Sequence, residues 1–294
     1  MRSSFPRYPF VRRAVSRFMP GEDVKDALAA SAEFQKRRIA TILTLLGENV
    51  KDEKAACAVV RHYEGVLDEI QRARLDAEVS VKLTHLGLDI GPGVAGGLLL
   101  SLAQGAARRG AMVWVDMESS AYTQATIDVF RRVRGTCANV GLCLQAYLRR
   151  TERDLEDLLP LGAAIRLTKG AYAEPGSVAF TRKADVDSSF LRLAERMLGS
   201  DMVRNGARIA IATHDREMIR KVQETAAVRS LSREACEFEM LYGIQSSEQS
   251  RLAAEGYRVR VLISYGAEWF PWYMRRLAER PANLWFVARN LFQS

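Results

Sequence analysis

The residues that could do chemistry in this chain are charged or polar side chains at the ends of short apolar segments. Such groups are costly inside an apolar segment unless they are paired or contact a ligand. Taken singly, each has a structural explanation, such as one half of a buried ion pair. Their recurrence at the same place in successive segments favours a shared site. They are Glu48, Lys82, Asp116, Glu118, Gln145, Tyr147, Arg166, Lys169, Tyr172, His214 and Asp215.

This set of residues is rich in cations. Lys82, Arg166 and Lys169 are joined near the end of the chain by Arg275 and Arg276, in the stretch "WFPWYMRRLAERP". Neither a Ser-His-Asp nor a Cys-His arrangement is apparent in the sequence. The pattern therefore indicates a site that holds an anion, and a carboxylate substrate or a phosphorylated cofactor would both satisfy it.

Composition narrows the class of protein further. The chain has 294 residues, of which 48% are apolar, so it can bury a sizeable core. Its net charge of +8 would suit nucleic acid, an anionic membrane surface or an acidic substrate. The charge is spread without a Lys-rich run, so we expect no nucleic-acid partner. No apolar run approaches the roughly 18 residues of a membrane span.

Histidines and cysteines give no pattern of a metal site or a disulfide framework. The three histidines are not at metal-ligand spacing, so we expect no metal. None of the four cysteines forms a CxxC pair, which is typical of reduced core thiols in a cytosolic protein. Residues 1–23 superficially resemble a transit peptide, but we interpret them as a helix with a solvated basic face.

Eight apolar, β-rich segments alternate with helical patterns along the chain. Residues 185–199 repeat apolar side chains at helical spacing and end at a glycine, and the glycine-rich stretch 91–97 is interpreted as a loop that opens a helix. This alternation predicts a parallel sheet, and the count favours a (β/α)8 barrel in one domain, with a doubly wound open sheet as the alternative. The predicted strands are 38–47, 79–87, 111–118, 140–147, 163–172, 207–215, 236–243 and 257–266.

Five sequence blocks, in this order along the chain, carry a family resemblance: "LQAYLRRTERDL", "RLTKGAY", "ATHD", "FEMLYG" and "YMRRLAERPAN". Together they resemble the proline dehydrogenase family, FAD-dependent enzymes that oxidise L-proline to Δ1-pyrroline-5-carboxylate. The similarity runs from about Phe18 to Val287 and is closest to the short monofunctional bacterial form. It implies a TIM-type barrel in a single domain over 1–294, with N-terminal helices in 1–37, the barrel in 38–266, and a last helix over the barrel mouth in 267–294.

The resemblance assigns the substrate site to residues that lie far apart in the sequence. It implies that Arg275 and Arg276 hold the proline carboxylate and that Lys82 assists them. The side chains of Tyr273, Leu241 and Leu262 would wall the proline ring. By the same similarity, Glu48 would pair with one of the two arginines, which would otherwise repel each other in an empty site.

The resemblance also assigns residues to the flavin. Asp116 and Arg166 are the expected catalytic pair, with Arg166 near the reactive N5 edge and Asp116 orienting it. Met117 and Gln145 would face the isoalloxazine ring, and Glu279 would touch the flavin or steady the arginines. The expected contacts to the remaining parts of FAD are Lys169, Gly170, Ala171, Thr213 and His214.

A mechanism and a cellular setting follow from the same resemblance. Hydride would leave C5 of proline for N5 of the flavin, and a quinone would take the electrons. A separate pyrroline-5-carboxylate dehydrogenase would act next, because the chain has no sequence left for an aldehyde dehydrogenase domain. We expect a cytoplasmic protein. Its positive charge is compatible with a peripheral contact at the anionic inner face of the membrane.

The chain departs from the family pattern in its first and last strands. Leu262 and Ser264 stand where a tyrosine and a proline are usual, and Thr44 stands where an acid is usual. Leu262 cannot donate a hydrogen bond, so oxidation of hydroxyproline or another cyclic imino acid stays an alternative. A basic barrel that binds nucleic acid or phosphorylated ligands without catalysis is the alternative from another class.

Overall fold

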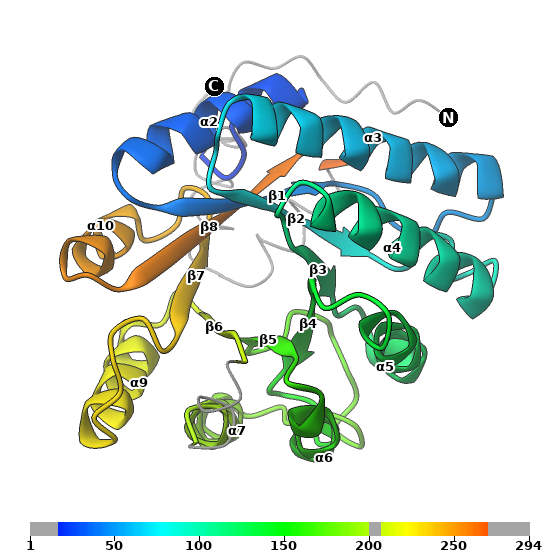
Figure 1. Ribbon diagram of the computed structural model, residues 1–294. Helices are drawn as coiled ribbons and strands as arrows, with labels where there is room; N and C mark the ends of the chain where they lie inside the picture. Colours follow the sequence, from blue (N-terminus) through cyan, green and yellow to red (C-terminus); the bar gives the residue numbers. More distant parts are fainter. Residues whose placement is uncertain (1–16, 200–206, 270–294) are drawn as a thin grey trace, which may run out of the picture.

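The strands of this chain close into one parallel barrel. The computed structural model describes residues 17–199 and 207–269, and in it β1 to β8 follow one another around the barrel in sequence order (Figure 1). The predicted (β/α)8 architecture is therefore confirmed. The strands are β1 Ala40–Leu45, β2 Ala77–Lys82, β3 Val113–Asp116, β4 Val140–Gln145, β5 Ala164–Thr168, β6 Ile209–Ala212, β7 Glu237–Leu241 and β8 Arg258–Tyr265.

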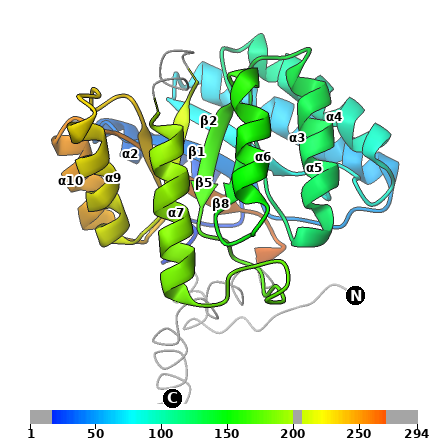
Figure 2. The same ribbon diagram turned by 90° about the horizontal axis from the view of Figure 1, so that it is seen from below.

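Helices connect successive strands and surround the barrel. Figure 2 shows α5, α6 and α7 standing side by side along its outer surface. The glycine-rich stretch 91–97 was predicted as a loop that opens a helix, but only Gly91 precedes α4 and residues 92–97 form its first turns. The helices are α2 Val24–Lys36, α3 Glu53–Arg72, α4 Pro92–Ala107, α5 Ser120–Arg134, α6 Thr151–Leu158, α7 Lys183–Met197, α9 Arg216–Val228 and α10 Ser246–Ala254, with a 3₁₀ turn, η1, at Leu159–Leu161.

Helix α3 illustrates how the sequence builds these layers. The Asp52 side chain accepts a hydrogen bond from Ala55 N and so caps the helix. Apolar residues at helical spacing, among them Val59 and Leu67, are buried against the barrel. From the same face, Tyr63 donates its hydroxyl to Ser80 O at 2.8 Å and ties the helix to β2.

The second strand is shorter than the sequence indicates. Residues 79–87 were predicted as one strand, but β2 ends at Lys82 and the chain then turns. The carboxylate of Glu118 accepts hydrogen bonds from both Thr84 N and Thr84 Oγ1, which fixes this turn. Buried leucines at 83 and 86 give the turn the apolar pattern of a strand.

The barrel interior combines an aromatic layer with buried charges. Trp114 is fully buried there with Ile42, Ala164 and Ala210. A Cβ at Gly141 would lie 2.6 Å from the Trp114 ring, so only glycine fits beside this indole. Three arginines and four acids share this interior, which in such barrels is usually filled by branched aliphatic side chains. They are Arg166, Arg208, Arg260, Glu78, Asp116, Glu237 and Glu239.

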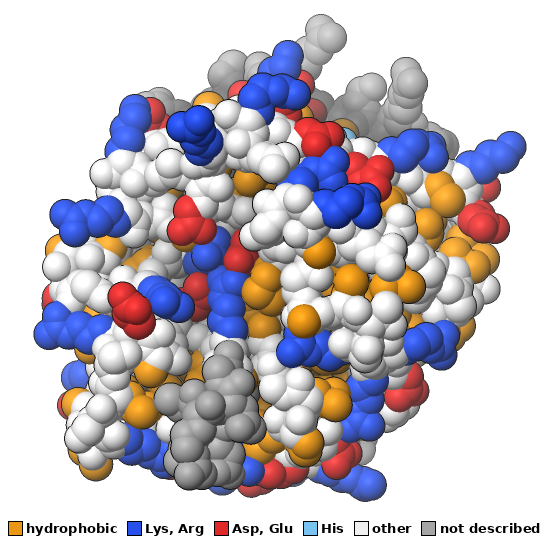
Figure 3. Space-filling model, viewed as in Figure 1, with side chains coloured by type: hydrophobic (Ala, Val, Ile, Leu, Met, Phe, Trp, Pro, Cys, Tyr) orange, Lys and Arg blue, Asp and Glu red, His pale blue; other side chains and the backbone are white. Residues whose placement is uncertain are grey.

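The outer surface shows no single-sign field on the face in Figure 3, where acidic side chains lie beside basic ones. Within the described ranges no helix is both long and apolar enough to cross a membrane. Trp269, the last described residue, donates its indole Nε1 to Glu22 Oε1 at 3.0 Å. This contact joins the end of the described chain to the segment before α2.

Candidate active site

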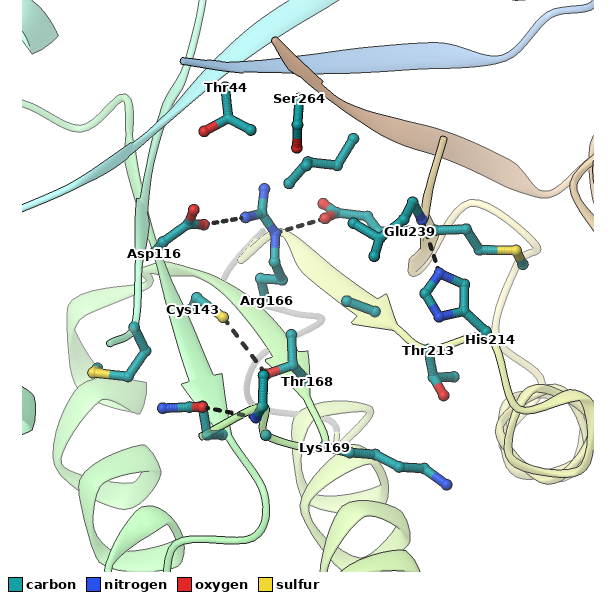
Figure 4. A pocket seen from close by; sticks show the side chains of 18 of the residues that line it. Thr44, Asp116, Cys143, Arg166, Thr168, Lys169, Thr213, His214, Glu239 and Ser264 are labelled. Carbon is teal, nitrogen blue, oxygen red and sulfur yellow. Dashed lines mark hydrogen bonds and ion pairs between the residues drawn. The ribbon is translucent and has the colours of Figure 1, made fainter. Parts of the chain in front are cut away.

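A cavity of about 450 Å³ lies at the carboxyl ends of the strands, within the size range of small-molecule sites. Every strand of the barrel contributes side chains to the cavity wall, and some of the loops that follow the strands contribute further residues (Figure 4). Its lining residues include Thr44, Lys82, Asp116, Met117, Cys143, Gln145, Arg166, Thr168, Lys169, Gly170, Ala171, Tyr172, Thr213, His214, Glu239, Leu241, Leu262 and Ser264.

Arg166 is the central cation of this cavity. Its Nη1 donates to Asp116 Oδ1 at 3.0 Å, so the hydrogen bond predicted between the two residues is present. Its Nε lies 2.6 Å from Glu239 Oε2, and Figure 4 shows the guanidinium between the two carboxylates. The guanidinium also packs over the Trp114 ring, 4.5 Å from its centroid. These contacts hold a charge whose side chain is only 3% exposed.

One donor of Arg166 is left over after these contacts. The buried Nη2 has no hydrogen-bond partner in residues 17–199 and 207–269. A buried guanidinium nitrogen without a partner is costly. Because Arg166 lines the cavity, this nitrogen is a candidate donor for a bound molecule.

The loop after β5 forms a second part of the wall. Gly170 has a φ of +121°, and a Cβ there would lie 2.2 Å from the Tyr147 ring, so the turn requires glycine. Ala171 N donates to Gln145 Oε1 at 3.4 Å, while Gln145 Nε2 donates to Glu118 O at 2.8 Å. The amide of Gln145 is therefore fixed in one orientation at the cavity edge.

Lys169, on the same loop, is held by acids from two other segments. Its Nζ lies 2.7 Å from Asp215 Oδ2 and also binds Asp187 at the start of α7. Burial opposes the ionisation of both carboxyls, but their hydrogen bonds to Lys169 help to lower the pKa of each. Lys169 thus reaches the cavity as part of an ion-pair cluster.

The loop after β6 adds Thr213 and His214 to the cavity. His214 Nε2 accepts a hydrogen bond from Leu241 N at 2.9 Å, which places the proton of the neutral ring on Nδ1. Thr213 Oγ1 accepts from Asp215 N at 3.2 Å. The bond between His214 and Leu241 joins the ends of β6 and β7, and the one between Thr213 and Asp215 shapes the loop itself.

The rim on the opposite side carries Lys82 and two buried titratable groups near it. Burial, and to a smaller extent the charge of Lys82, lower the pKa of His85 to about 4. Burial raises the pKa of Glu118, against the hydrogen bonds that it accepts from Thr84. Both groups therefore favour their neutral forms more than they would in water.

The structure brings the predicted site residues together where it describes them. The residues assigned to substrate and flavin all line the cavity except Glu48, which follows β1 and is half-buried. Glu118, Tyr147 and Asp215, also expected at the strand ends, do not line it. Tyr273, Arg275, Arg276 and Glu279 lie outside the described residues.

The sequence reasoning missed several cavity residues. They are Cys143, Thr168 and, above all, Glu239. The signal for Glu239 was present in the stretch "CEFEML", because acids two residues apart in a strand point to the same face.

Comparison with known proteins agrees with this geometry. The family model described as proline dehydrogenase matches residues 27–289. The chain is 35% identical over 280 residues to proline dehydrogenase 2 of Bacillus subtilis strain 168, covering 95% of this chain and 91% of that protein. It is 34% identical over 286 residues to a proline dehydrogenase of Deinococcus radiodurans, covering 94% of this chain and 89% of that protein.

Solved structures share the fold. Proline utilization A from Bdellovibrio bacteriovorus, inactivated by N-propargylglycine, aligns with a TM-score of 0.84 at 23% identity. The alignment covers 91% of this chain but 32% of that one, so this chain spans about a third of that longer protein. Proline utilization A from Bradyrhizobium japonicum aligns with a TM-score of 0.75 at 22% identity, over 90% of this chain and 30% of that one.

The cavity at the strand ends, the buried arginine between two acids and a family match over most of the sequence agree with one another. The chain belongs to the proline dehydrogenase family, whose members oxidise proline to Δ1-pyrroline-5-carboxylate.

Proposed function

We propose that this chain oxidises L-proline with FAD as its cofactor and that both bind in the cavity at the carboxyl ends of the strands. The activity follows from membership of the family. The proposal adds the cofactor and the roles of individual residues. The observation that supports it best is Arg166, which has a buried, unpartnered Nη2 on the cavity wall in the described part of the chain.

The donor set of the cavity fits a flavin nucleotide. A guanidinium and a fixed amide, from Arg166 and Gln145, are suited to the polar edge of a flavin ring. The turn at Gly170 lets a ligand approach the backbone closely. We assign FAD contacts to Met117, Gln145, Arg166, Lys169, Gly170, Ala171, Thr213 and His214, and to Glu279 outside the described residues.

The redox step belongs to the cofactor and its control to the side chains. When bound, FAD would supply the acceptor, N5 of the flavin, for hydride from C5 of proline, which is chemistry that no side chain supplies. Arg166 presents positive charge where negative charge develops. Asp116 and Glu239 hold the guanidinium in place, so this charge needs no reorganisation during the reaction.

The substrate is held by charge at one end and by apolar contact at the other. Lys82 on the rim would bind the proline carboxylate together with Arg275 and Arg276. Leu241 and Leu262 give the cavity an apolar wall for the ring. The amine of proline must be unprotonated for hydride to leave, and this cluster of cations favours the neutral amine.

Hydroxyproline is the second candidate substrate, and Ser264 is the reason to test it. Ser264 Oγ is buried on the cavity wall beside Leu262 and has no hydrogen-bond partner among the described residues. It could bind a ring hydroxyl that Leu262 cannot. We favour proline, because Leu262 offers an unsubstituted ring a matching apolar surface.

The proposal also covers the electron acceptor, the next enzyme and the location in the cell. We assign a quinone as acceptor and a separate pyrroline-5-carboxylate dehydrogenase as the next enzyme. The net charge of +8 supports a cytoplasmic protein that touches the anionic inner face of the membrane.

An absorption spectrum tests cofactor and substrate together. The purified protein should show a flavin band that bleaches when L-proline is added without oxygen, and a quinone should restore it. A protein that is colourless and cannot be loaded with FAD would contradict the proposal and favour a non-catalytic barrel. Faster bleaching by trans-4-hydroxy-L-proline, abolished in Ser264→Ala, would replace proline by hydroxyproline.

A variant of the chain's end tests the carboxylate clamp. In Arg276→Ala we expect a large rise in KM for proline with FAD still bound, because the lost contact is to the substrate. Arg251→Ala on α10, an arginine that pairs with Glu248 away from the cavity, is the control. Loss of FAD from Arg276→Ala would show that the clamp is assigned wrongly.

A further inference from the structure

A column of charged side chains runs inside the barrel from the cavity toward its opposite end. Glu239 pairs with Arg166 at the cavity, and Glu237, two residues earlier on β7, lies on the same face of that strand. Arg208 Nη2 lies 2.6 Å and Arg260 Nε 3.4 Å from the oxygens of Glu237. The two glutamates therefore connect Arg166 to the deeper arginines.

The charges in this column balance only if one acid is protonated. Three guanidiniums, those of Arg166, Arg208 and Arg260, face four carboxyls, those of Glu78, Asp116, Glu237 and Glu239. Asp76 also reaches Arg260, but its side chain is 69% exposed and solvent screens it. An uncompensated charge is costly in the interior, so one proton on the acids is expected.

Glu239 is the acid with the best reason to carry that proton. Two guanidiniums contact Glu237, whereas Glu239 has one, which it shares with Asp116. The buried Oε1 of Glu239 has no donor in the described part of the chain. A proton on Glu239, shared with the neighbouring carboxyl of Glu237, would give this oxygen a hydrogen bond.

The pKa directions agree with this placement. Burial raises the pKa of Glu239 to about 8, against the charge of Arg166. Burial also opposes ionisation of Glu237, but Arg260 and Arg208 outweigh it and lower the pKa of that carboxyl.

The other groups around the pair come from five strands and the segment before β6. Burial raises the pKa of Cys143 to about 11, so this thiol stays neutral where Glu239 titrates. Arginines keep their charge in proteins. Among the described residues, the groups that face the pair are Arg166 from β5, Arg208 before β6, Arg260 from β8, Asp116 from β3, Cys143 from β4, and Glu78 and Lys82 from β2.

We propose that Glu239 is a positioning residue for Arg166 and that, with Glu237, it holds one proton that sets the net charge beneath the cavity. With the proton present, Glu239 is a neutral acceptor, and the positive charge of Arg166 remains available to the cavity. Without it, a second carboxylate offsets the guanidinium. The consequence for the flavin rests on the proposed function, whereas the shared proton is a property of the protein alone.

One substitution imitates the protonated state. The amide of Glu239→Gln can accept from Arg166 and donate to Glu237, but it carries no charge at any pH. Glu239→Ala removes both contacts. Glu248→Gln is the matched control, because Glu248 is also buried and arginine-paired but lies on α10 and does not line the cavity.

Infrared spectroscopy of the protein without cofactor tests the proton. We expect a band of a protonated carboxylic acid that is lost as the pH rises through about 8. This band should be missing from the spectrum of Glu239→Gln and retained in Glu248→Gln. The difference between wild type and Glu239→Gln separates it from any band of Glu118. If Glu239→Gln keeps the titrating band, the shared proton is overturned.

The reduction potential of bound FAD tests the positioning role. Above the pKa of Glu239, the wild-type potential should fall more steeply with pH than that of Glu239→Gln, and Glu248→Gln should follow the wild type. Glu239→Ala should lose kcat and retain FAD poorly, and Glu239→Gln should restore both near neutral pH. Identical pH profiles for wild type and Glu239→Gln would overturn the role. A wild type that cannot bind FAD would overturn the proposed function, while the infrared titration would still decide the shared proton.

Discussion

The two ends of the barrel interior use the same residue types for different purposes. Arg166 at the cavity and Arg208 at the opposite end both pack over Trp114 and both contact two acids. Arg166 keeps a buried nitrogen without a partner among the described residues, whereas no such atom is found for Arg208 there. Both arginines are charged and paired with acids, so the unpartnered donor is the feature by which we assign Arg166 the binding role proposed above and Arg208 a structural one.

Removing the structural arginine should produce the largest effect. Arg208→Ala removes the closer of the two arginines that contact Glu78 and Glu237 and leaves only the longer contacts to Arg260, so we expect a loss of about 3–5 kcal/mol in the free energy of unfolding. Urea denaturation of the protein without cofactor measures it. Arg166→Ala should cost less, because the proposed proton leaves Glu239 uncharged and Asp116 is partly exposed. Equal losses of unfolding free energy in the two variants would contradict the different roles assigned to Arg166 and Arg208.

The binding arginine should matter most in the reaction. Arg166→Lys keeps a positive charge but cannot reproduce the forked contacts to Asp116 and Glu239. We expect kcat to fall by about 10²–10³-fold, as when one aimed donor is lost from an active site, with the fold retained. Stopped-flow reduction of the flavin by L-proline measures this step. Arg192→Lys, at an exposed ion pair with Glu152, should change neither quantity.

Acid should destabilise the cavity end through His85. Burial and then Lys82 depress its folded pKa to about 4 from an ordinary value of 6.5, so between these values the unfolded chain binds more protons. Stability is therefore lost as the pH falls through this window, by roughly 2–3 kcal/mol at its lower end. In His85→Asn this pH-dependent loss should disappear, although the packing cost remains at every pH. Denaturation curves recorded across the window supply the slope, and an unchanged slope would contradict the assignment.

The smallest expected effect concerns the turn at Gly170. An alanine there must adopt an unfavourable positive φ and push the Tyr147 ring aside, at a cost of about 1–3 kcal/mol. If the turn holds FAD, Gly170→Ala should weaken FAD binding by at least about tenfold. Gly162→Ala is the control, because Gly162 also has a positive φ but borders open space. FAD retention is measured by dialysis. Equal retention in the two variants would show that the turn at Gly170 does not contribute to FAD binding.

The sequence predicted the eight strands of the barrel but only some of the side-chain contacts that fix them in place. Alternating apolar segments placed all eight strands, because covering a parallel sheet on both faces leaves a strong pattern. The pairing of Asp116 with Arg166 was also expected. The turn after Lys82 was misjudged, because its buried leucines imitate a strand and the Glu118 contact that bends it comes from the next strand.

Side-chain pairing between distant segments is what the sequence left open. Lys169 is held by Asp187 and Asp215, which lie 18 and 46 positions away, and no local pattern selects these acids among the many others. Glu239 was missed although its spacing from Glu237 was visible. Which arginine each acid meets depends on the register of the closed barrel, which only the structure shows.

The contact between Trp114 and Gly141 has an evolutionary consequence. The indole occupies the space that a side chain on the neighbouring strand would need, so any side chain at 141 collides with it. Replacing the tryptophan alone would open a void between two guanidiniums. A lineage that changes this layer must therefore change both positions together, and we expect them to covary among homologous sequences.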